Sequence, residues 1–471
     1  MPDHEEPTGL FGGVFARGGV EVGDTAWLQA MLDAEAGLAR ALERAGLTPA
    51  GSGEAVTAAA RADDFDPNEL GRLAALTGNP VPGLARALAR RVPQSAASAV
   101  HCGATSQDII DTAAMLLAKR AIDVMLADLT RVAGAAAGLA ETHRNTIMIG
   151  RTLLQQAVPV TFGLIAAGWL TSVDEARGGL AAVRARRLAV QFGGAAGTLA
   201  PLGGHGQRVA ALLAEELGLA RPILPWPTDR LRIMDLGAAL GRVTAVLGKL
   251  ARDVTLLAQS EIGEVSEESV KDRSEQPGSA SPRRGGSSAM PHKHNPVASV
   301  AILGCAKQVP GLLSTLTAAS EQELQRAAGA WHAEWEPLTV LLRLAGSASS
   351  WAAELLAGLT VDASRMAANL AATKGLPLAE HVASLLAGVL GGAEAHDLVA
   401  EAAARAVGAG LPLRDVLVDV PELEKRLTAA GVSPEQIDSA LEPSGYLGSA
   451  DAFITAALGA HQSLELEVAS G

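Results

Sequence analysis

The stretch that decides the fold runs from Asp108 to Ala133 and reads DIIDTAAMLLAKRAIDVMLADLTRVA. It contains neither glycine nor proline, and it is rich in alanine and leucine, two of the best helix formers. The preceding residues Thr105 to Asp108, TSQD, are typical of a helix start. We therefore predict one long helix. Its apolar residues recur at the spacing of a helix face: Ile109, Leu116, Ile122, Met125, Leu129 and Val132.

Other stretches have the residue pattern of a helix. Trp27 to Ala45 is periodic and stops at Gly46, and three longer runs are expected to be helical: residues 159–190, 232–264 and 297–325. Long helices in series pack at shallow angles into bundles. We therefore predict an all-α fold, with a central bundle of long helices and smaller N- and C-terminal helical domains. The expected divisions are residues 1–107, 108–361 and 362–471.

One uncharged run, from Thr152 to Val173, raises the question of a membrane span. It contains Gln155, Gln156, Pro159 and two glycines, which fit a lipid-spanning segment poorly. We therefore expect a buried helix of a soluble protein there and no membrane partner. The N-terminal MPDHEEPTGLFGG also lacks the basic region and apolar core of a signal peptide.

The overall composition argues against several other classes of protein. A formal net charge of −13 argues against a nucleic-acid-binding protein, although a local cluster of donors can still bind a small anion. The two cysteines, Cys102 and Cys305, are far apart and provide neither a disulfide framework nor the spacing of metal ligands. Such cysteine usage suits a reducing compartment, and we expect a cytoplasmic protein.

The most distinctive stretch runs from Gly285 to Pro296 and reads GGSSAMPHKHNP. It follows the polar, Gly/Pro/Ser-rich residues 271–286, KDRSEQPGSASPRRGG, which predict a loop. This loop has small residues, then Lys and Asn, and then a helix start. Such a loop can close over an anion and direct hydrogen-bond donors at it.

This string resembles the signature loop of the fumarase/aspartase superfamily, GSSxMPxKxNP. Two other stretches agree with that family in the same order, namely His101 to Asp108, HCGATSQD, and Gly150 to Gln155, GRTLLQ. The resemblance extends over nearly the whole chain, including Gly329 to Trp335, GAWHAEW. The resemblance is greatest to the 3-carboxy-cis,cis-muconate cycloisomerase branch of the family. Nitrosuccinate lyase is a relative of these cycloisomerases.

The resemblance implies a homotetramer whose active sites are each built from three subunits. It also implies a small di- or tricarboxylate substrate and neither a metal nor an organic cofactor. The implied reaction removes a proton from the carbon next to a carboxylate, forms an enediolate-like dianion, and expels the group on the neighbouring carbon. Such chemistry needs a base at the carbon and dense donors around the carboxylate that gains charge.

By position, Ser288 matches the family's catalytic base, and its surroundings must activate it because a hydroxyl is a poor base in water. Lys293 and Asn295 match the residues that hold the activated carboxylate. The other expected substrate-binding residues are Thr105, Ser106, Gln155, Arg326 and Arg230. The structural alternatives are a helix cap at Thr105 and Ser106 and a buried amide at Gln155.

Three positions depart from the patterns of relatives. Leu153 stands where several members place a His that assists departure of an amine or hydroxide. The cycloisomerase branch reads Trp-His-Thr and Glu-His-Glu/Gln-Arg, whereas this chain has Pro227 and Leu324 at the two His positions. His101 remains a candidate catalytic residue, with packing at a helix end as the alternative.

The loss of candidate acids bears on the leaving group. Hydroxide, ammonia and amidine leave poorly without a proton, whereas a carboxylate or nitrite leaves readily. We therefore predict a serine-base β-elimination from a small 2-substituted succinate such as nitrosuccinate, releasing nitrite and fumarate. The alternative is a 3-carboxy-cis,cis-muconate cycloisomerase.

Two rival functions are less consistent with the sequence. The intact Ser288, Lys293 and Asn295 argue against a non-catalytic structural paralogue, since drift erodes such positions first. An adenylosuccinate-type lyase would need nucleotide-phosphate contacts and acid histidines that we do not find in the sequence.

Overall fold

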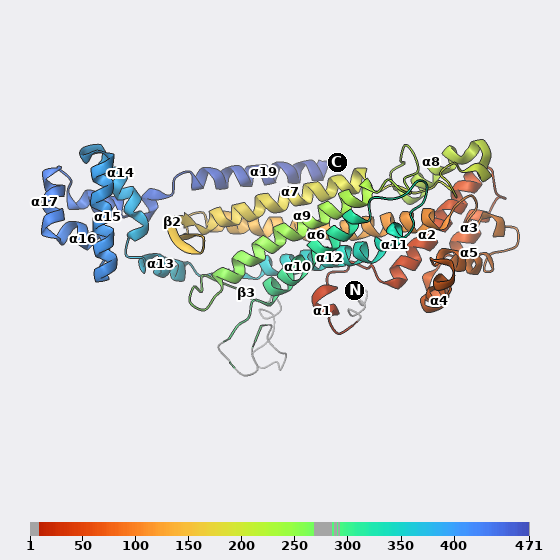
Figure 1. Ribbon diagram of the computed structural model, residues 1–471, viewed down its shortest axis with the longest axis horizontal. Coiled ribbons are helices and arrows are strands. Elements are labelled where there is room, and N and C mark those ends of the chain that lie inside the picture. The colour runs from red at the N-terminus through yellow and green to blue at the C-terminus, as the bar shows by residue number, and fades with distance from the viewer. Residues whose placement is uncertain (1–8, 268–284, 287–289, 291–292, 471) are drawn as a thin grey trace. The chain divides into compact units, whose positions relative to one another are not determined.

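The computed structural model describes residues 9–267, 285–286, 290 and 293–470 (Figure 1). These residues form long α-helices with two small antiparallel strand pairs, and the predicted all-α class is confirmed. The long helices are α2 (Asp24–Arg44), α6 (Ser106–Thr142), α7 (Phe162–Arg186), α9 (Leu231–Leu257), α10 (Val297–Ala318), α12 (Trp335–Ala357) and α19 (Ala450–Ser470).

The chain divides into two compact units. Unit 1 comprises residues 1–131, 175–251 and 298–354, and unit 2 comprises residues 132–174, 252–297 and 355–471. The cuts fall inside long helices, so this division does not coincide with the three predicted segments, which remain a prediction. The shorter helices of unit 1 are α1 (Gly12–Phe15), α3 (Ser52–Ala59), α4 (Pro67–Thr77), α5 (Val81–Ala89), α8 (Gly206–Leu217) and α11 (Ala330–Ala333).

Within unit 1 the long helices pack through small residues. A β-carbon on Gly241 of α9 would lie 2.7 Å from Leu313 of α10, so glycine permits this close approach. Arg177 of α7 donates to Thr130 of α6 at 3.0 Å. The apolar stripe predicted over Asp108 to Ala133 is buried along α6, which confirms the long helix.

Unit 2 contains both strand pairs. β1 (Ile147–Thr152) pairs with β2 (Gln155–Thr161), and β3 (Val265–Glu267) pairs with β4 (Leu359–Val361). Five of its helices enclose a separate apolar cluster that includes Leu386, Leu398 and Leu417. The shorter helices of unit 2 are α13 (Ala363–Ala371), α14 (Ala379–Leu390), α15 (Gly392–Ala409), α16 (Leu413–Asp419), α17 (Pro421–Ala429) and α18 (Pro434–Ala440).

The prediction of a buried helix from Thr152 to Val173 is wrong for residues 152–161. Thr152 ends strand β1, Leu153 and Leu154 form a turn, residues 155–161 form strand β2, and the helix begins only at Phe162. Pro159 supplies no backbone N–H and disfavours helical geometry at Val158, while β-branched Val160 and Thr161 favour a strand. Two other predicted helices end early, at Leu257 and Ala318.

A membrane span is tested by length and composition. Among the described residues, α10 is long and apolar enough to cross a membrane, and 33% of its apolar window is buried within the chain. Core helices of proteins that never enter a membrane pass the same test, so α10 is weak evidence.

Candidate active site

The start of α6 is held by a buried carboxylate. Asp108 Oδ2 accepts hydrogen bonds from Thr105 N at 3.1 Å and Gly194 N at 2.8 Å, and Oδ1 accepts from Gln191 Nε2 at 3.2 Å. Burial raises the pKa of Asp108 to about 6, although the backbone donors and the charge of Arg326 act against that rise. Asp108 therefore connects the predicted helix start at Thr105 to Gly194.

Arg326 completes this cluster. Its Nη2 donates to the carbonyl oxygen of Gly194, and its charge acts on Asp108. Its Nη1 is buried and has no hydrogen-bond partner among the described residues. Thr105, Asp108, Gly194 and Arg326 thus lie together in unit 1, and Arg326 keeps a donor for an anion. Its predicted role as an anion clamp stays a prediction.

Thr105 and Ser106 are half-buried. The structure records no hydrogen bond from either hydroxyl to another described residue. The helix cap is instead supplied by Asp108, which accepts from Thr105 N. Both hydroxyls are therefore available to a ligand at the helix N-terminus, as their predicted role in substrate binding requires.

His101 is paired with a residue that the sequence reading did not single out. Its Nδ1 lies 2.6 Å from Glu35 Oε1, and its backbone N–H donates to Glu35 Oε2 at 2.9 Å. Burial lowers the pKa of His101, but the hydrogen bond and charge of Glu35, with the charge of Asp108, outweigh it and leave the pKa raised. Glu35 is a charged residue within an otherwise apolar, buried stripe of α2. This interruption was the sequence signal that could have identified Glu35 as a site residue.

Arg230 has a different environment from the one expected of an anion clamp. Its side chain is 1% exposed and forms ion pairs with Asp111 at 2.8 Å and Glu334 at 2.6 Å. Its Nη1 also reaches the carbonyl oxygen of Pro227, so all of its donors are used. This geometry argues against a substrate contact and corrects the predicted role. Arg230 holds two buried carboxylates in place.

The segments that carry the two departures from the cycloisomerase pattern are joined in unit 1 by one hydrogen bond. Thr228 Oγ1 donates to the carbonyl oxygen of Leu324 at 2.8 Å, and the carbonyl oxygen of Pro227 accepts from Gln107 Nε2 at 2.7 Å. The Leu324 side chain is largely exposed, and its φ of +43° lies in the left-handed region. Both apolar replacements therefore border the segment that carries Arg326.

In unit 2 the β1–β2 hairpin carries Gln155. Gln155 pairs with Thr152 across a two-residue turn of Leu153 and Leu154, whose φ values are +51° and +64°. Each left-handed leucine costs about 1–2 kcal/mol. Leu153 is 95% exposed and Leu154 71% exposed, so this hairpin tip projects strained apolar side chains from the chain.

The hairpin is anchored next to its turn by Arg151. Arg151 donates to both carboxylate oxygens of Glu264 at 2.8 Å, and Asn369 Nδ2 donates to the same carboxylate at 2.8 Å. A β-carbon on Gly150 would lie 2.7 Å from the carbonyl oxygen of Val158, so glycine is required by close approach of the strands. The GRTLLQ stretch therefore presents Gln155 from an anchored scaffold.

The signature loop is described in part, and Ser288 lies outside the described residues. At its base, Asn295 N donates to the carbonyl oxygen of Gly285 at 2.8 Å, and Asn295 Nδ2 reaches the same oxygen at 3.0 Å. Gly285 has a φ of +78°, and a β-carbon there would lie 2.4 Å from Asn295 O. Lys293 and Asn295 are exposed, and their predicted roles stay predictions.

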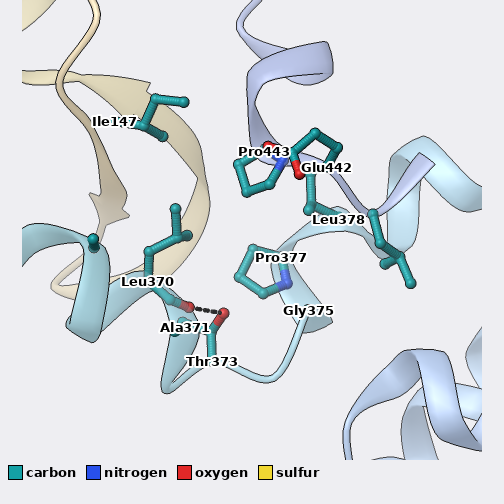
Figure 2. Close-up of a pocket in the computed structure, with 11 residues that line it drawn as sticks. Ile147, Leu370, Ala371, Thr373, Gly375, Pro377, Leu378, Glu442 and Pro443 are labelled. Carbon is teal, nitrogen blue, oxygen red and sulfur yellow. Dashed lines mark hydrogen bonds between the residues drawn. The ribbon is translucent and has the colours of Figure 1, made fainter. Parts of the chain in front are cut away.

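Unit 2 contains a cavity of about 310 Å³ (Figure 2). Leu370, Pro377, Leu378 and Pro443 line it, and Glu442 is the charged residue among its lining groups. None of the predicted site residues lines this cavity. Among the described residues no group of three or more His, Cys, Asp or Glu side chains is arranged to hold a metal ion.

Comparisons with known proteins give a consistent family. Residues 22–311 match the family described as "Lyase", and residues 375–457 match the one described as "Adenylosuccinate lyase C-terminus". The chain is 46% identical over 449 residues to nitrosuccinate lyase of Streptomyces davaonensis, covering 93% of this chain and 91% of that protein. It is 46% identical over 447 residues to 3-carboxy-cis,cis-muconate cycloisomerase of Pseudomonas aeruginosa, covering 94% of each.

Solved structures of similar proteins support the same family. The 3-carboxy-cis,cis-muconate lactonizing enzyme from Pseudomonas putida has a TM-score of 0.87 at 41% identity, covering 96% of this chain and 99% of that chain. A fumarate lyase from Mesorhizobium has a TM-score of 0.81 at 34% identity, covering 93% of this chain and 96% of that chain. Since two relatives with different names are equally identical to this chain, overall identity does not separate their reactions.

Proposed function

The chain belongs to the fumarase/aspartase superfamily of lyases, and on that premise we propose that it eliminates nitrite from a small 2-substituted succinate, nitrosuccinate, to give fumarate. The observation that carries the proposal is that Pro227 and Leu324 stand at the two positions where a cycloisomerase is expected to have His. Thr228, which follows Pro227, donates to the carbonyl oxygen of Leu324, so the two replacements lie in segments of unit 1 that contact each other.

The proposed reaction follows from the chemistry of the leaving group. A base removes the proton from the carbon next to one carboxylate, and the electron pair moves into that carboxylate. The pair then forms the carbon–carbon double bond as the carbon–nitrogen bond breaks and nitrite departs with its electrons. Nitrite is a weak base and needs no proton to leave, which is consistent with Leu153 in place of an acid.

We assign the roles by position and environment. Ser288 acts as the base, while Lys293 and Asn295 stabilise the carboxylate that gains charge. Thr105, Ser106 and Arg326 bind the other carboxylate, supported by the two unengaged hydroxyl groups and by the buried, unpartnered Nη1 of Arg326.

The proposal includes a homotetramer with shared active sites and a cytoplasmic location. The exposed, strained Leu153–Leu154 tip beside Gln155 supports sharing, because exposed apolar side chains at a rigid tip favour contact with another copy of the chain. The separated cysteines support a reducing compartment.

The second candidate is a 3-carboxy-cis,cis-muconate cycloisomerase, favoured by the relative from Pseudomonas aeruginosa and by the structure from Pseudomonas putida. A parallel assay of the purified protein distinguishes the two. Nitrosuccinate and 3-carboxy-cis,cis-muconate are supplied separately, and fumarate, nitrite and lactone are measured. Fumarate with equimolar nitrite supports the proposal. Lactone formation without nitrite release replaces it with the cycloisomerase, and inactivity on both substrates rejects both.

A further inference from the structure

We propose that Glu35 is a positioning residue that accepts a hydrogen bond from Nδ1–H of His101 and holds its imidazolium in one orientation, so that Nε2–H of His101 donates to an anionic oxygen of the substrate. The inference rests on the proposed function for its substrate class, a small dicarboxylate. It adds a residue from helix α2, outside the three motifs that define the predicted site.

The contacts of Glu35 are directed at a single residue. The Glu35 side chain is 0% exposed, and its two oxygens bind the ring and the backbone of His101. A buried carboxylate is retained only where hydrogen bonds or a charge compensate for the loss of water. His101 provides two hydrogen bonds to the Glu35 carboxylate and, when protonated, a positive charge. The same contacts determine where the imidazole lies.

The backbone of His101 is held in an unfavourable conformation. Its φ of +56° lies in the left-handed region, which glycine adopts more easily than histidine. Ala104 N donates to the carbonyl oxygen of His101 at 3.3 Å, and Thr105 follows directly. A strained residue next to proposed substrate-binding hydroxyls indicates that the side chain is needed at that position.

The pairing also sets the chemistry of the ring. Because Nδ1 is engaged by Glu35 and the side chain is 25% exposed, Nε2 is the nitrogen that remains for a ligand. The charged groups acting on the ring are Glu35 from α2 and Asp108 from α6, and both favour the imidazolium. An imidazolium donates Nε2–H to a carboxylate or to a departing anion, which suits a dicarboxylate that gains charge during the reaction.

The first test measures the ring without requiring turnover. The chain has ten histidines, so ¹⁵N-histidine NMR of the full-length protein is assigned by loss of one signal in His101→Gln. In the wild type we expect Nδ1 of the neutral ring to carry the proton, and we expect succinate, the dicarboxylate probe, to shift the Nε2 signal. A neutral ring protonated on Nε2, or no response of His101 to bound succinate, would overturn the inference.

The second test uses Glu35→Gln, which keeps the volume of the side chain and removes its charge. We expect kcat to fall at least tenfold with a smaller change in KM, and we expect the alkaline limb of the pH profile to move to lower pH. The limb moves because the imidazolium loses its carboxylate partner. The control is Asp33→Asn on the same helix, whose carboxylate pairs with Arg120 and not with His101.

The outcomes separate this inference from the proposed function. If the wild type turns over neither assay substrate but His101 responds to succinate, the proposed function fails and the positioning role stands. If turnover of nitrosuccinate is normal in Glu35→Gln and its pH profile is unchanged, Glu35 has only a packing role. If Glu35→Gln does not fold, the tautomer and succinate response of the wild-type protein decide.

Discussion

Thr228 Oγ1 donates a 2.8 Å hydrogen bond to the carbonyl oxygen of Leu324, joining two segments that are 96 residues apart in the chain. The backbone of Leu324 is in the left-handed region, and its side chain is exposed two residues before Arg326 in the sequence. If Arg326 binds the substrate as proposed, Leu324 is a position at which the choice of substrate can be tested.

Leu324→His is expected to shift specificity toward 3-carboxy-cis,cis-muconate. The imidazole restores a polar group for the extra carboxylate, and a change in relative kcat/KM of about tenfold corresponds to about 1.4 kcal/mol. The ratio of kcat/KM for carboxymuconate and nitrosuccinate measures it. Val407→His, at another exposed apolar position, serves as the control. An unchanged ratio in Leu324→His would remove this residue from the specificity argument.

Ser288→Ala is expected to abolish turnover of nitrosuccinate, with kcat reduced by roughly a thousandfold or more if the hydroxyl is the base. A single-turnover assay of fumarate release measures the chemical step. Circular dichroism and sedimentation should be the same as for the wild type. Ser287→Ala is the matched control, because it removes the neighbouring hydroxyl. If Ser287→Ala were the inactive variant instead, the base would have to be reassigned.

Arg230→Met is expected to destabilise the protein by about 3–5 kcal/mol, because it leaves the buried Asp111 and Glu334 without their cation. Urea unfolding of both proteins measures the loss. Arg405→Met, which breaks a half-exposed pair with Glu401, is expected to cost less than about 1 kcal/mol. Normal stability with a raised KM in Arg230→Met would restore the predicted anion clamp.

The pKa of Asp108 predicts a pH dependence of stability. Burial raises this pKa from 3.8 to about 6 in the folded chain, so folding favours the protonated carboxyl. The stability contributed by protonated Asp108 is therefore complete below pH 3.8 and is lost as the pH rises to about 6. The stability of the wild type relative to Asp108→Asn should decrease over that interval in urea unfolding. An increase instead would mean that the backbone donors and Arg326 outweigh burial.

The sequence predicted the fold better than it predicted the roles of charged side chains. The periodicity of α6 was sufficient to locate a helix, because one apolar face repeats along it. The β1–β2 hairpin was missed because its strands lack alternation and its turn has two leucines instead of Asn-Gly. Its conformation depends on anchors distant in sequence, such as Glu264 for Arg151.

The same reasoning explains the outcome at the candidate site. Thr105 and Arg326 were predicted separately as substrate-binding residues, and Asp108 and Gly194 connect them in the structure, while their roles stay predictions. The sequence could not distinguish a clamp from a structural arginine at Arg230, because the two carboxylates that pair with it are distant in sequence, Asp111 on α6 and Glu334 between α11 and α12. The sequence signal for Glu35 was weak, since it was only a charged residue in a buried apolar stripe. Its partner, His101, is identified only by the three-dimensional structure.

The hairpin tip gives the sharpest test of shared active sites. Replacing Leu153 with Asn and Leu154 with Gly introduces the pair preferred in such turns and relieves about 1–2 kcal/mol of strain per residue. An isolated chain should therefore be stabilised. If the leucines contact another copy, the double variant should instead lose at least tenfold in turnover and dissociate at higher protein concentration, measured by assay and sedimentation. Leu76→Asn, at an exposed position in α4, should leave both unchanged. A fully active, equally associated double variant would show that the tip does not contribute to a shared site.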